Sequence, residues 1–170
     1  MSASGDSGGL GGLTKAESSI HERSEMIENS QWAEGVNFAA IETIAKYVET
    51  YRVGEGAVIF NEGAQEAYMC LVIEGRVSIL KLDSAQQYKE VGTCGPGKTF
   101  GEMSLIDDDL RSASAIALKG ALLLVLTKQN FLRLAEEHPL LGFKILQKLS
   151  KLVSQRLRQT SGTLVEFLPG

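Results

Sequence analysis

Residues 92–102, GTCGPGKTFGE, carry the clearest chemical signal in the chain, because two phosphate-binding patterns overlap in them. Residues 92–99 fit the pattern G-x-x-x-x-G-K-[ST], in which backbone amides and a lysine hold the phosphates of a nucleoside triphosphate. A few residues further on, Phe100-Gly101-Glu102 is followed by Arg111, which offers a loop, a carboxylate and a guanidinium. The two patterns predict different proteins, and the elements around them decide between the two.

A triphosphate-binding loop needs a helix that begins at its lysine and a parallel sheet with crossover helices. Here Phe100 and Gly101 follow Lys98-Thr99, and about one helical turn separates Glu102 from the acidic run at 107–109. The flanking segments are short β-prone runs separated by glycines, as in an antiparallel sandwich or barrel. We therefore expect Lys98 to lie in a surface turn. The alternative, a nucleoside triphosphatase that uses Lys98, predicts Mg²⁺-dependent hydrolysis.

The second pattern suits an anion that also carries a hydroxyl group. A short helical turn after Glu102 leaves backbone N–H groups free to meet an anion, and Gly101 permits close approach of a ligand. Arg111 can donate two N–H bonds to a phosphate. The neighbouring Glu102 makes sense if its carboxylate accepts a sugar hydroxyl. A structural ion pair between Glu102 and Arg111 is the simpler alternative.

The hydrophobic pattern changes its period twice along the chain. We expect a polar helix within 14–29, capped by Thr14 or Ser18, and a second helix over 38–48, capped by Asn37. The middle of the chain is β-prone, and strands are predicted at 58–60, 70–73, 77–80, 88–91, 113–118 and 122–126.

After Thr127 the helical period returns. A short helix is predicted over 129–137, stopped by Pro139, which then begins a long helix that ends at Gly162. That helix carries a broad apolar stripe through residues 141, 145, 149 and 152. Five basic side chains are expected to lie mostly off the stripe and to be solvated: Lys144, Lys148, Lys151, Arg156 and Arg158.

The composition is that of one globular domain with 44% hydrophobic and 22% charged residues. The net charge of −4 argues against a nucleic-acid partner. The longest wholly apolar run, 121–126, is too short to span a bilayer, and 1–13 lacks the apolar core of a signal peptide, so we expect a cytoplasmic protein with no membrane partner. The two cysteines and two histidines show no metal-ligand spacing, so no metal site is predicted.

The chain resembles the cyclic nucleotide-binding domain family, which is found in catabolite activator proteins, cyclic-nucleotide-dependent kinases and gated channels. The resemblance covers 36–160 and includes the segment 56–63, Gly75, Pro96-Gly97 and the phosphate-binding cassette 100–113. It implies an α+β, mainly β fold: an antiparallel β-roll (a jelly-roll-like double-stranded β-helix) with N-terminal helices and a long C-terminal helix.

The resemblance also implies a binding site. Glu102 would accept the ribose 2′-hydroxyl of a 3′,5′-cyclic nucleotide, and Arg111 and the amides of Ser104 and Leu105 would hold the cyclic phosphate. The predicted binding residues are Phe100, Gly101, Glu102, Met103, Ser104, Leu105, Arg111, Ser112 and Ala113, with Val91, Thr160 and Ser161 as further candidates. The order Arg-Ser-Ala slightly favours cAMP over cGMP, and a cyclic dinucleotide is left open. The aspartates at 107–109 place negative charge near the entrance, which weakens an anionic ligand.

The predicted organisation is a flexible tail at 1–13, a short helical extension at 14–35, the binding domain at 36–160 and a C-terminal tail at 161–170. Only about ten residues follow Thr160, too few for a DNA-reading helix-turn-helix. We expect a free-standing, non-enzymatic regulatory module that signals by moving its C-terminal helix, either to an unknown protein partner or within a homodimer. The alternative is a degenerate β-roll without a nucleotide, in which the aspartates at 107–109 neutralise Arg111.

Overall fold

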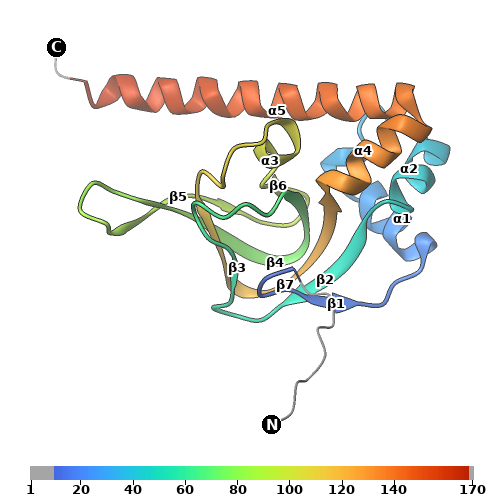
Figure 1. Cartoon of the computed structure of the whole chain (residues 1–170), viewed down its shortest axis with the longest axis horizontal. Helices are drawn as coiled ribbons and strands as arrows, with labels where there is room; N and C mark the ends of the chain where they lie inside the picture. The colour runs from blue at the N-terminus through green and yellow to red at the C-terminus, as the bar shows by residue number, and fades with distance from the viewer. Residues whose placement is uncertain (1–9, 169–170) are drawn as a thin grey trace, which may run out of the picture.

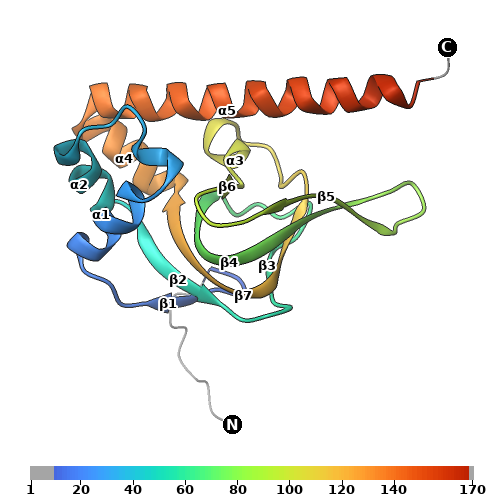
Figure 2. The same cartoon turned by 180° about the vertical axis from the view of Figure 1, so that it is seen from behind.

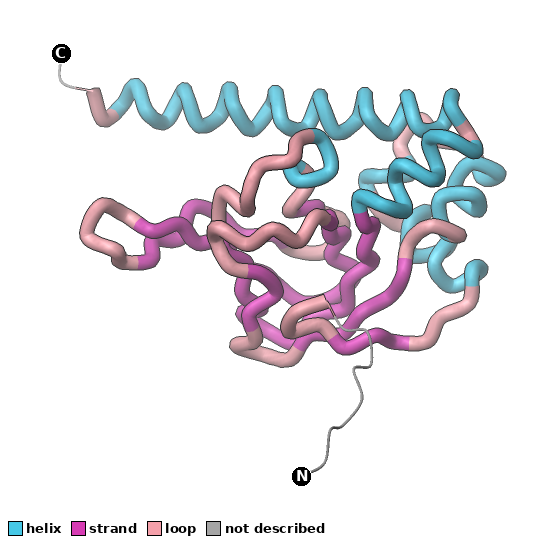
Figure 3. Tube along the Cα trace, viewed as in Figure 1, coloured by secondary structure: helices cyan, strands magenta, loops and turns pink. Residues whose placement is uncertain are grey.

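The computed structural model describes residues 10–168, whose strands bend into a β-roll with helices packed at one end and along one side (Figures 1 and 3). In chain order the elements are β1 (Thr14–Ala16), α1 (Ile20–Glu28), η1 (Gln31–Ala33), α2 (Phe38–Ala45), β2 (Glu49–Val53), β3 (Val58–Phe60), β4 (Tyr68–Leu82), β5 (Tyr88–Cys94), β6 (Thr99–Phe100), α3 (Met103–Ile106), β7 (Ser114–Thr127), α4 (Lys128–Glu137) and α5 (Pro139–Glu166). Within the described range the strands form one seven-stranded sheet in the order β1-β2-β7-β4-β5, with β3 on β7 and β6 on β4. The fold class predicted from the sequence is confirmed.

Two long strands, β4 and β7, form the centre of the roll. The sequence predicted each of them as two separate strands, and this prediction is wrong: β4 is continuous over 15 residues and β7 over 14. Their pairing changes register near Gly75, where φ is +90° and an added Cβ would lie 2.4 Å from the Gly120 carbonyl oxygen. Gly75 therefore lets β4 approach the backbone of Gly120 and Ala121 closely, where a side chain at position 75 would have forced the strands apart.

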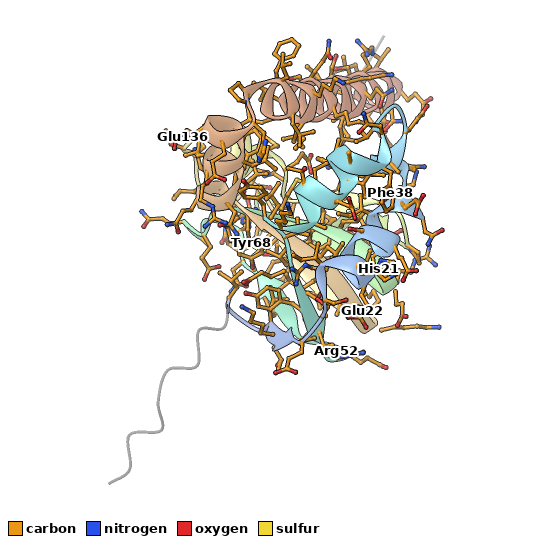
Figure 4. All side chains as sticks on the ribbon, turned by 90° about the vertical axis from the view of Figure 1, so that its right-hand side faces the viewer. His21, Glu22, Phe38, Arg52, Tyr68 and Glu136 are labelled. Atoms are coloured by element: carbon orange, nitrogen blue, oxygen red, sulfur yellow. The ribbon has the colours of Figure 1, made fainter. Side chains whose placement is uncertain are left out.

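Two hydrophobic clusters hold the layers together. One fills the interior of the roll, and the other lies between the sheet and the helices α1, α2, α4 and α5. Tyr68, labelled in Figure 4, lies inside the molecule, whereas Phe38 lies on its surface. Figures 1 and 2 show that α5 leaves the helical end and runs over α3, past the body of the roll. The second half of α5 is thus positioned over the phosphate-binding cassette.

The N-terminal part of the chain departs from the prediction. Thr14–Ala16 is a strand paired with β2, so neither Thr14 nor Ser18 caps a helix. Ser19 caps α1 instead, in a reciprocal capping box with Glu22. The predicted cap of α2 is confirmed, because the Asn37 side chain accepts from the Ala40 amide at 2.9 Å, although this helix ends at Ala45.

Both ends of the described chain are more ordered than their composition suggested. Leu13, at the end of the predicted tail, is 4% exposed and joins the core of the roll, whereas residues 1–9 lie outside the described range. The predicted helix end at Gly162 is wrong, since α5 continues to Glu166. The glycine is tolerated there, and the additional turn lies over the mouth of the pocket described below.

Because α5 packs tightly on α4 at only one of two glycines, replacing each of these glycines of α5 by alanine should have opposite effects on stability. In Gly142→Ala the new Cβ would lie 2.6 Å from the Ala135 Cβ, which forces the helices apart at a cost of about 1–3 kcal/mol. In Gly162→Ala the new methyl group meets nothing within 4 Å and raises helix propensity, a gain of up to about 1 kcal/mol. Urea denaturation of the two variants measures the difference. Equal stability of the two would show that the helices are not in tight contact.

Candidate functional site

A pocket of about 990 Å³ lies between β5, the cassette and the second half of α5. Its lining runs from Phe60 to Phe167, so it brings together residues that are far apart in the sequence. Ten of the predicted site residues line it: Val91, Phe100, Gly101, Glu102, Met103, Ser104, Arg111, Ser112, Ala113 and Thr160. Leu105 is buried outside the lining, and Ser161 does not reach it. The predicted residues are therefore largely assembled around one cavity.

Gly101 and the short helix α3 shape the floor of the pocket. Gly101 has φ +76°, and a Cβ there would lie 2.8 Å from Arg111 Nη1, so only glycine fits. The amide of Leu105, predicted to meet a phosphate, donates to the Glu102 carbonyl at 3.1 Å in this structure. This amide is occupied within α3 and is not presented to a ligand.

Arg111 is 5% exposed and is held without a carboxylate partner among residues 10–168. Its Cζ lies 3.9 Å from the centroid of the Phe60 ring and 4.5 Å from that of Tyr68. Nη1 donates to the Gly101 carbonyl at 3.1 Å and to the Ser104 hydroxyl at 2.6 Å, and Nη2 donates to the Tyr68 carbonyl at 2.7 Å. Burial lowers the pKa of Arg111, as expected for a cation removed from water.

Glu102 is 2% exposed and pairs with Arg156, which was expected from the sequence to be solvated. Arg156 of α5 donates through Nη1 to Glu102 Oε1 and through Nη2 to the Thr99 carbonyl. The expectation that Arg156 is solvated is wrong, although its side chain keeps 39% exposure. The simple ion pair between Glu102 and Arg111 is also not formed. A signal for Arg156 did exist, because it occupies the next position of the apolar stripe 145, 149 and 152, of which Ile145 and Leu149 are buried.

Two polar atoms in the pocket wall lack a partner. Within the described range, Glu102 Oε2 and Arg111 Nε are the buried side-chain atoms that make no hydrogen bond with the protein. Such atoms are rare in folded proteins, because each one forfeits the hydrogen bonds it made to water. One is an acceptor and the other a donor, so the pocket offers both kinds of group to a ligand.

The acidic run does not neutralise Arg111. The carboxylate of Asp108 pairs with Lys128 at the start of α4, and this hydrogen bond lowers the pKa of Asp108. Lys128 Nζ also donates to the Asp107 carbonyl at 2.8 Å, which ties the loop to α4. Asp107 and Asp109 line the pocket, so negative charge remains near its entrance.

Other candidate chemistries find no support in the described part of the chain. Lys98 lies exposed in a turn beside Gln31, and the residues after it form β6, where a triphosphate-binding loop would begin a helix. Residues 10–168 contain no cluster of three side chains suited to a metal ion. Cys70 and Cys94 are buried free thiols whose pKa values are raised by burial. None of the described helices has the length and apolar character needed to cross a membrane.

A β-roll with a helix-covered pocket, a buried arginine and a buried glutamate is the architecture of a domain that binds a small polar ligand. The family model for the cyclic nucleotide-binding domain matches residues 51–138, just over half of the 170-residue chain. The chain therefore belongs to the cyclic nucleotide-binding domain family, and the resemblance noted in the sequence is confirmed.

Individual relatives agree with this assignment. The cyclic AMP receptor protein of Thermus thermophilus is 32% identical over 119 residues, which is 70% of this chain and 53% of that protein. The crystal structure of the catabolite activator protein of the same organism matches with a TM-score of 0.71 at 30% identity, covering 79% of this chain and 62% of the other. A cyclic nucleotide-binding domain from Methylobacillus flagellatus has a TM-score of 0.81 at 23% identity, over 94% and 91% of the two chains, and supports the fold alone.

The length of the match limits what these relatives imply. The chain spans about half of the Thermus receptor protein and 7% of a lysophospholipase from Aspergillus fumigatus to which it is 31% identical over 111 residues. What it shares with them is one domain. The activities of the whole proteins are therefore not assigned to this chain on the strength of the match.

Most of the contribution of Arg156 to stability should come from its ion pair with Glu102, and less from its hydrogen bond to the Thr99 carbonyl. Arg156→Met leaves Glu102 buried without a partner, and we expect the free energy of unfolding to fall by about 1–2 kcal/mol, since the partly exposed arginine lessens the effect. In a Glu102→Gln background the same substitution should cost less than about 0.5 kcal/mol.

Arg158→Met, an exposed neighbour on the same helix, is the matched control and should change stability little. Chemical denaturation of the wild type, Arg156→Met, Glu102→Gln and the double variant gives the four free energies of a double-mutant cycle. An equal cost of Arg156→Met in both backgrounds would mean that Arg156 acts through the Thr99 carbonyl or through packing, and not through this ion pair.

Proposed function

We propose that this chain binds a 3′,5′-cyclic nucleotide, with its phosphate at Arg111 and its ribose 2′-hydroxyl at Glu102, and transmits binding through α5. Two unpartnered buried atoms in one pocket carry this proposal: Arg111 Nε is a donor and Glu102 Oε2 an acceptor. A cyclic phosphate supplies acceptors for the first, and the adjoining ribose hydroxyl supplies a donor for the second. One small ligand thus satisfies both atoms at once.

The identity of the base is carried over from a relative. The Thermus protein is named as a receptor for cyclic AMP, and we propose the same ligand here, with cGMP as the alternative. The pocket wall offers hydroxyl groups from Ser112 on the cassette and from Thr160 and Thr163 on α5, which can meet the base from two sides. Its volume of about 990 Å³ leaves room for a mononucleotide.

Arg156 supplies the link from the ligand to α5. It donates to the same carboxylate that would accept the ribose hydroxyl, and it projects from the helix over the pocket. A ribose hydroxyl at Glu102 Oε2 shares the carboxylate with Arg156, which donates to Oε1, and so changes the contact that holds the second half of α5. The ligand then shifts α5 between arrangements by its differential affinity for them.

Binding is tested by thermal melts with cAMP, with cGMP and with ATP–Mg²⁺. A nucleotide at a hundred times its Kd should add about 2.7 kcal/mol of stability, which for a chain of this size raises the melting temperature by very roughly 5–10 °C. Arg111→Ala should abolish the shift. Arg111→Lys keeps the charge but loses the paired N–H donors of the guanidinium. It should strongly weaken the shift, and it tests the site if Arg111→Ala folds poorly.

Lys98→Ala is the control for the other phosphate pattern and should leave the cyclic nucleotide shift unchanged, since Lys98 lies outside the pocket. A well-folded protein that responds to neither cyclic nucleotide would favour the β-roll interaction module instead. A response to ATP–Mg²⁺ that is lost in Lys98→Ala would favour the triphosphatase.

The output we propose is a homodimer formed along α5. One side of this helix carries apolar side chains at the a and d positions of a heptad repeat, the spacing of a coiled-coil seam. These side chains are Phe143, Leu146, Val153, Leu157 and Leu164, with Ser150 and Thr160 at the intervening positions. Leu157 is 66% exposed, and Thr160 and Leu164 also line the pocket. The seam is self-complementary, because a second copy of α5 presents the same row, and it lies beside the face that carries Arg156.

A charge placed in this seam should dissociate the dimer. Leu157→Glu removes an apolar contact and sets two carboxylates against each other, so we expect the mass in solution to fall from twice 18.4 kDa to 18.4 kDa. Gln155→Glu introduces the same charge on another exposed side of the helix and should leave the mass unchanged. Analytical ultracentrifugation measures both. A wild-type protein that is monomeric at all concentrations would rule out the dimer.

A further inference from the structure

Ser104 contributes its side chain, and not only its amide, to the binding site. The residue lies in α3 and is 6% exposed. Its hydroxyl donates to the Gly101 carbonyl at 2.8 Å and accepts from Arg111 Nη1 at 2.6 Å. The Gly101 carbonyl also accepts from Arg111 Nη1, at 3.1 Å. The three groups form a closed hydrogen-bonded triangle that joins α3, the cassette loop and the guanidinium.

The aromatic contacts and the hydrogen bonds of Arg111 restrict different motions of its guanidinium. The rings of Phe60 and Tyr68 lie 3.9 and 4.5 Å from the guanidinium carbon, and such stacking holds the plane of the group. Stacking alone leaves the guanidinium free to turn within that plane. The hydrogen bonds to Gly101, Ser104 and Tyr68 remove this freedom, because each one binds a particular N–H.

Counting donors shows what is left for a ligand. A guanidinium has five N–H groups. Both hydrogens of Nη1 and one of Nη2 have acceptors in the protein. The Nε hydrogen, which no described residue accepts, and one Nη2 hydrogen remain. These two donors sit on neighbouring nitrogens and can be offered to one anion.

We infer that Ser104 is a positioning residue for the anion clamp: its hydroxyl sets the in-plane direction of the Arg111 guanidinium so that Nε is presented to the ligand. Alanine at this position leaves one Nη1 hydrogen without its nearest acceptor in a buried site. The guanidinium then gains alternative directions, and binding must restore the productive one. The inference rests on the proposed function for its ligand, but the orientation of Arg111 can be observed without ligand.

The test uses Ser104→Ala, with Ser24→Ala as the matched control. Ser24 is also buried, with 1% exposure, and donates to the Ile20 carbonyl in α1, away from the pocket. In the ligand-free wild type, nitrogen NMR of Arg111 should show separate Nη1 and Nη2 resonances, because the acceptors on these two nitrogens block rotation about the Nε–Cζ bond. These resonances should merge in Ser104→Ala and stay separate in Ser24→Ala.

Calorimetric titration with cAMP and with cGMP supplies the second readout. Ser104→Ala should raise the Kd of the nucleotide that binds by about tenfold, the effect of one hydrogen bond to a charged group, and Ser24→Ala should leave it unchanged. Separate Nη resonances in Ser104→Ala, an unchanged Kd or a tighter Kd would each overturn the inference.

Failure of the proposed function gives a different result. In that case the wild type binds neither nucleotide, and the NMR spectra alone decide the role of Ser104. Merged resonances would uphold the positioning of Arg111 by Ser104, and separate ones would refute it.

Discussion

The structure depends on the burial of one cation, the guanidinium of Arg111. Removing a charge from water is costly unless every donor finds an acceptor or a favourable surface. Phe60 from β3 and Tyr68 from β4 supply aromatic faces, and carbonyls of Tyr68 and Gly101 supply acceptors. Strand β3, the start of β4 and the segment 101–111 must therefore meet at one point in the folded chain. The requirement for glycine at position 101 follows from the same constraint, since a Cβ there would collide with the guanidinium.

The second buried charge is neutralised separately from the first. Glu102 takes its partner from α5, so the two opposite charges of the pocket face the same space without cancelling each other. A direct pair between Glu102 and Arg111 would have closed the site and left nothing for a ligand. The observed arrangement keeps one atom of each group unsatisfied. The stability that these two atoms forgo in the ligand-free protein is available to a ligand that pairs with both.

Local chemistry made much of the fold and the cassette predictable from the sequence. The Asn37 cap, the glycine-punctuated strands and the pattern of Phe100, Gly101, Glu102 and Arg111 each depend on nearby residues. They predicted an antiparallel sandwich or barrel with an anion site, and the resemblance to a known family added the β-roll. What was missed depends on distant partners. Thr14–Ala16 is a strand only because β2 lies beside it, and β4 continues through Gly75 against the backbone of Gly120 and Ala121, some 45 positions away. Arg156 finds Glu102 across 54 positions.

The position of Arg156 beside Leu157 gives α5 its mechanical role in the proposed function. Successive residues on a helix point about 100° apart, so the inner face that carries Arg156 and the apolar seam that carries Leu157 are rigidly connected. Any rotation of α5 that changes the contact with Glu102 must also turn the seam. Ligand binding and association of two copies are then linked through one rigid element, and linkage is reciprocal. A ligand that favours one rotation of α5 favours the dimer compatible with it, and dimer formation strengthens binding of that ligand by the same factor.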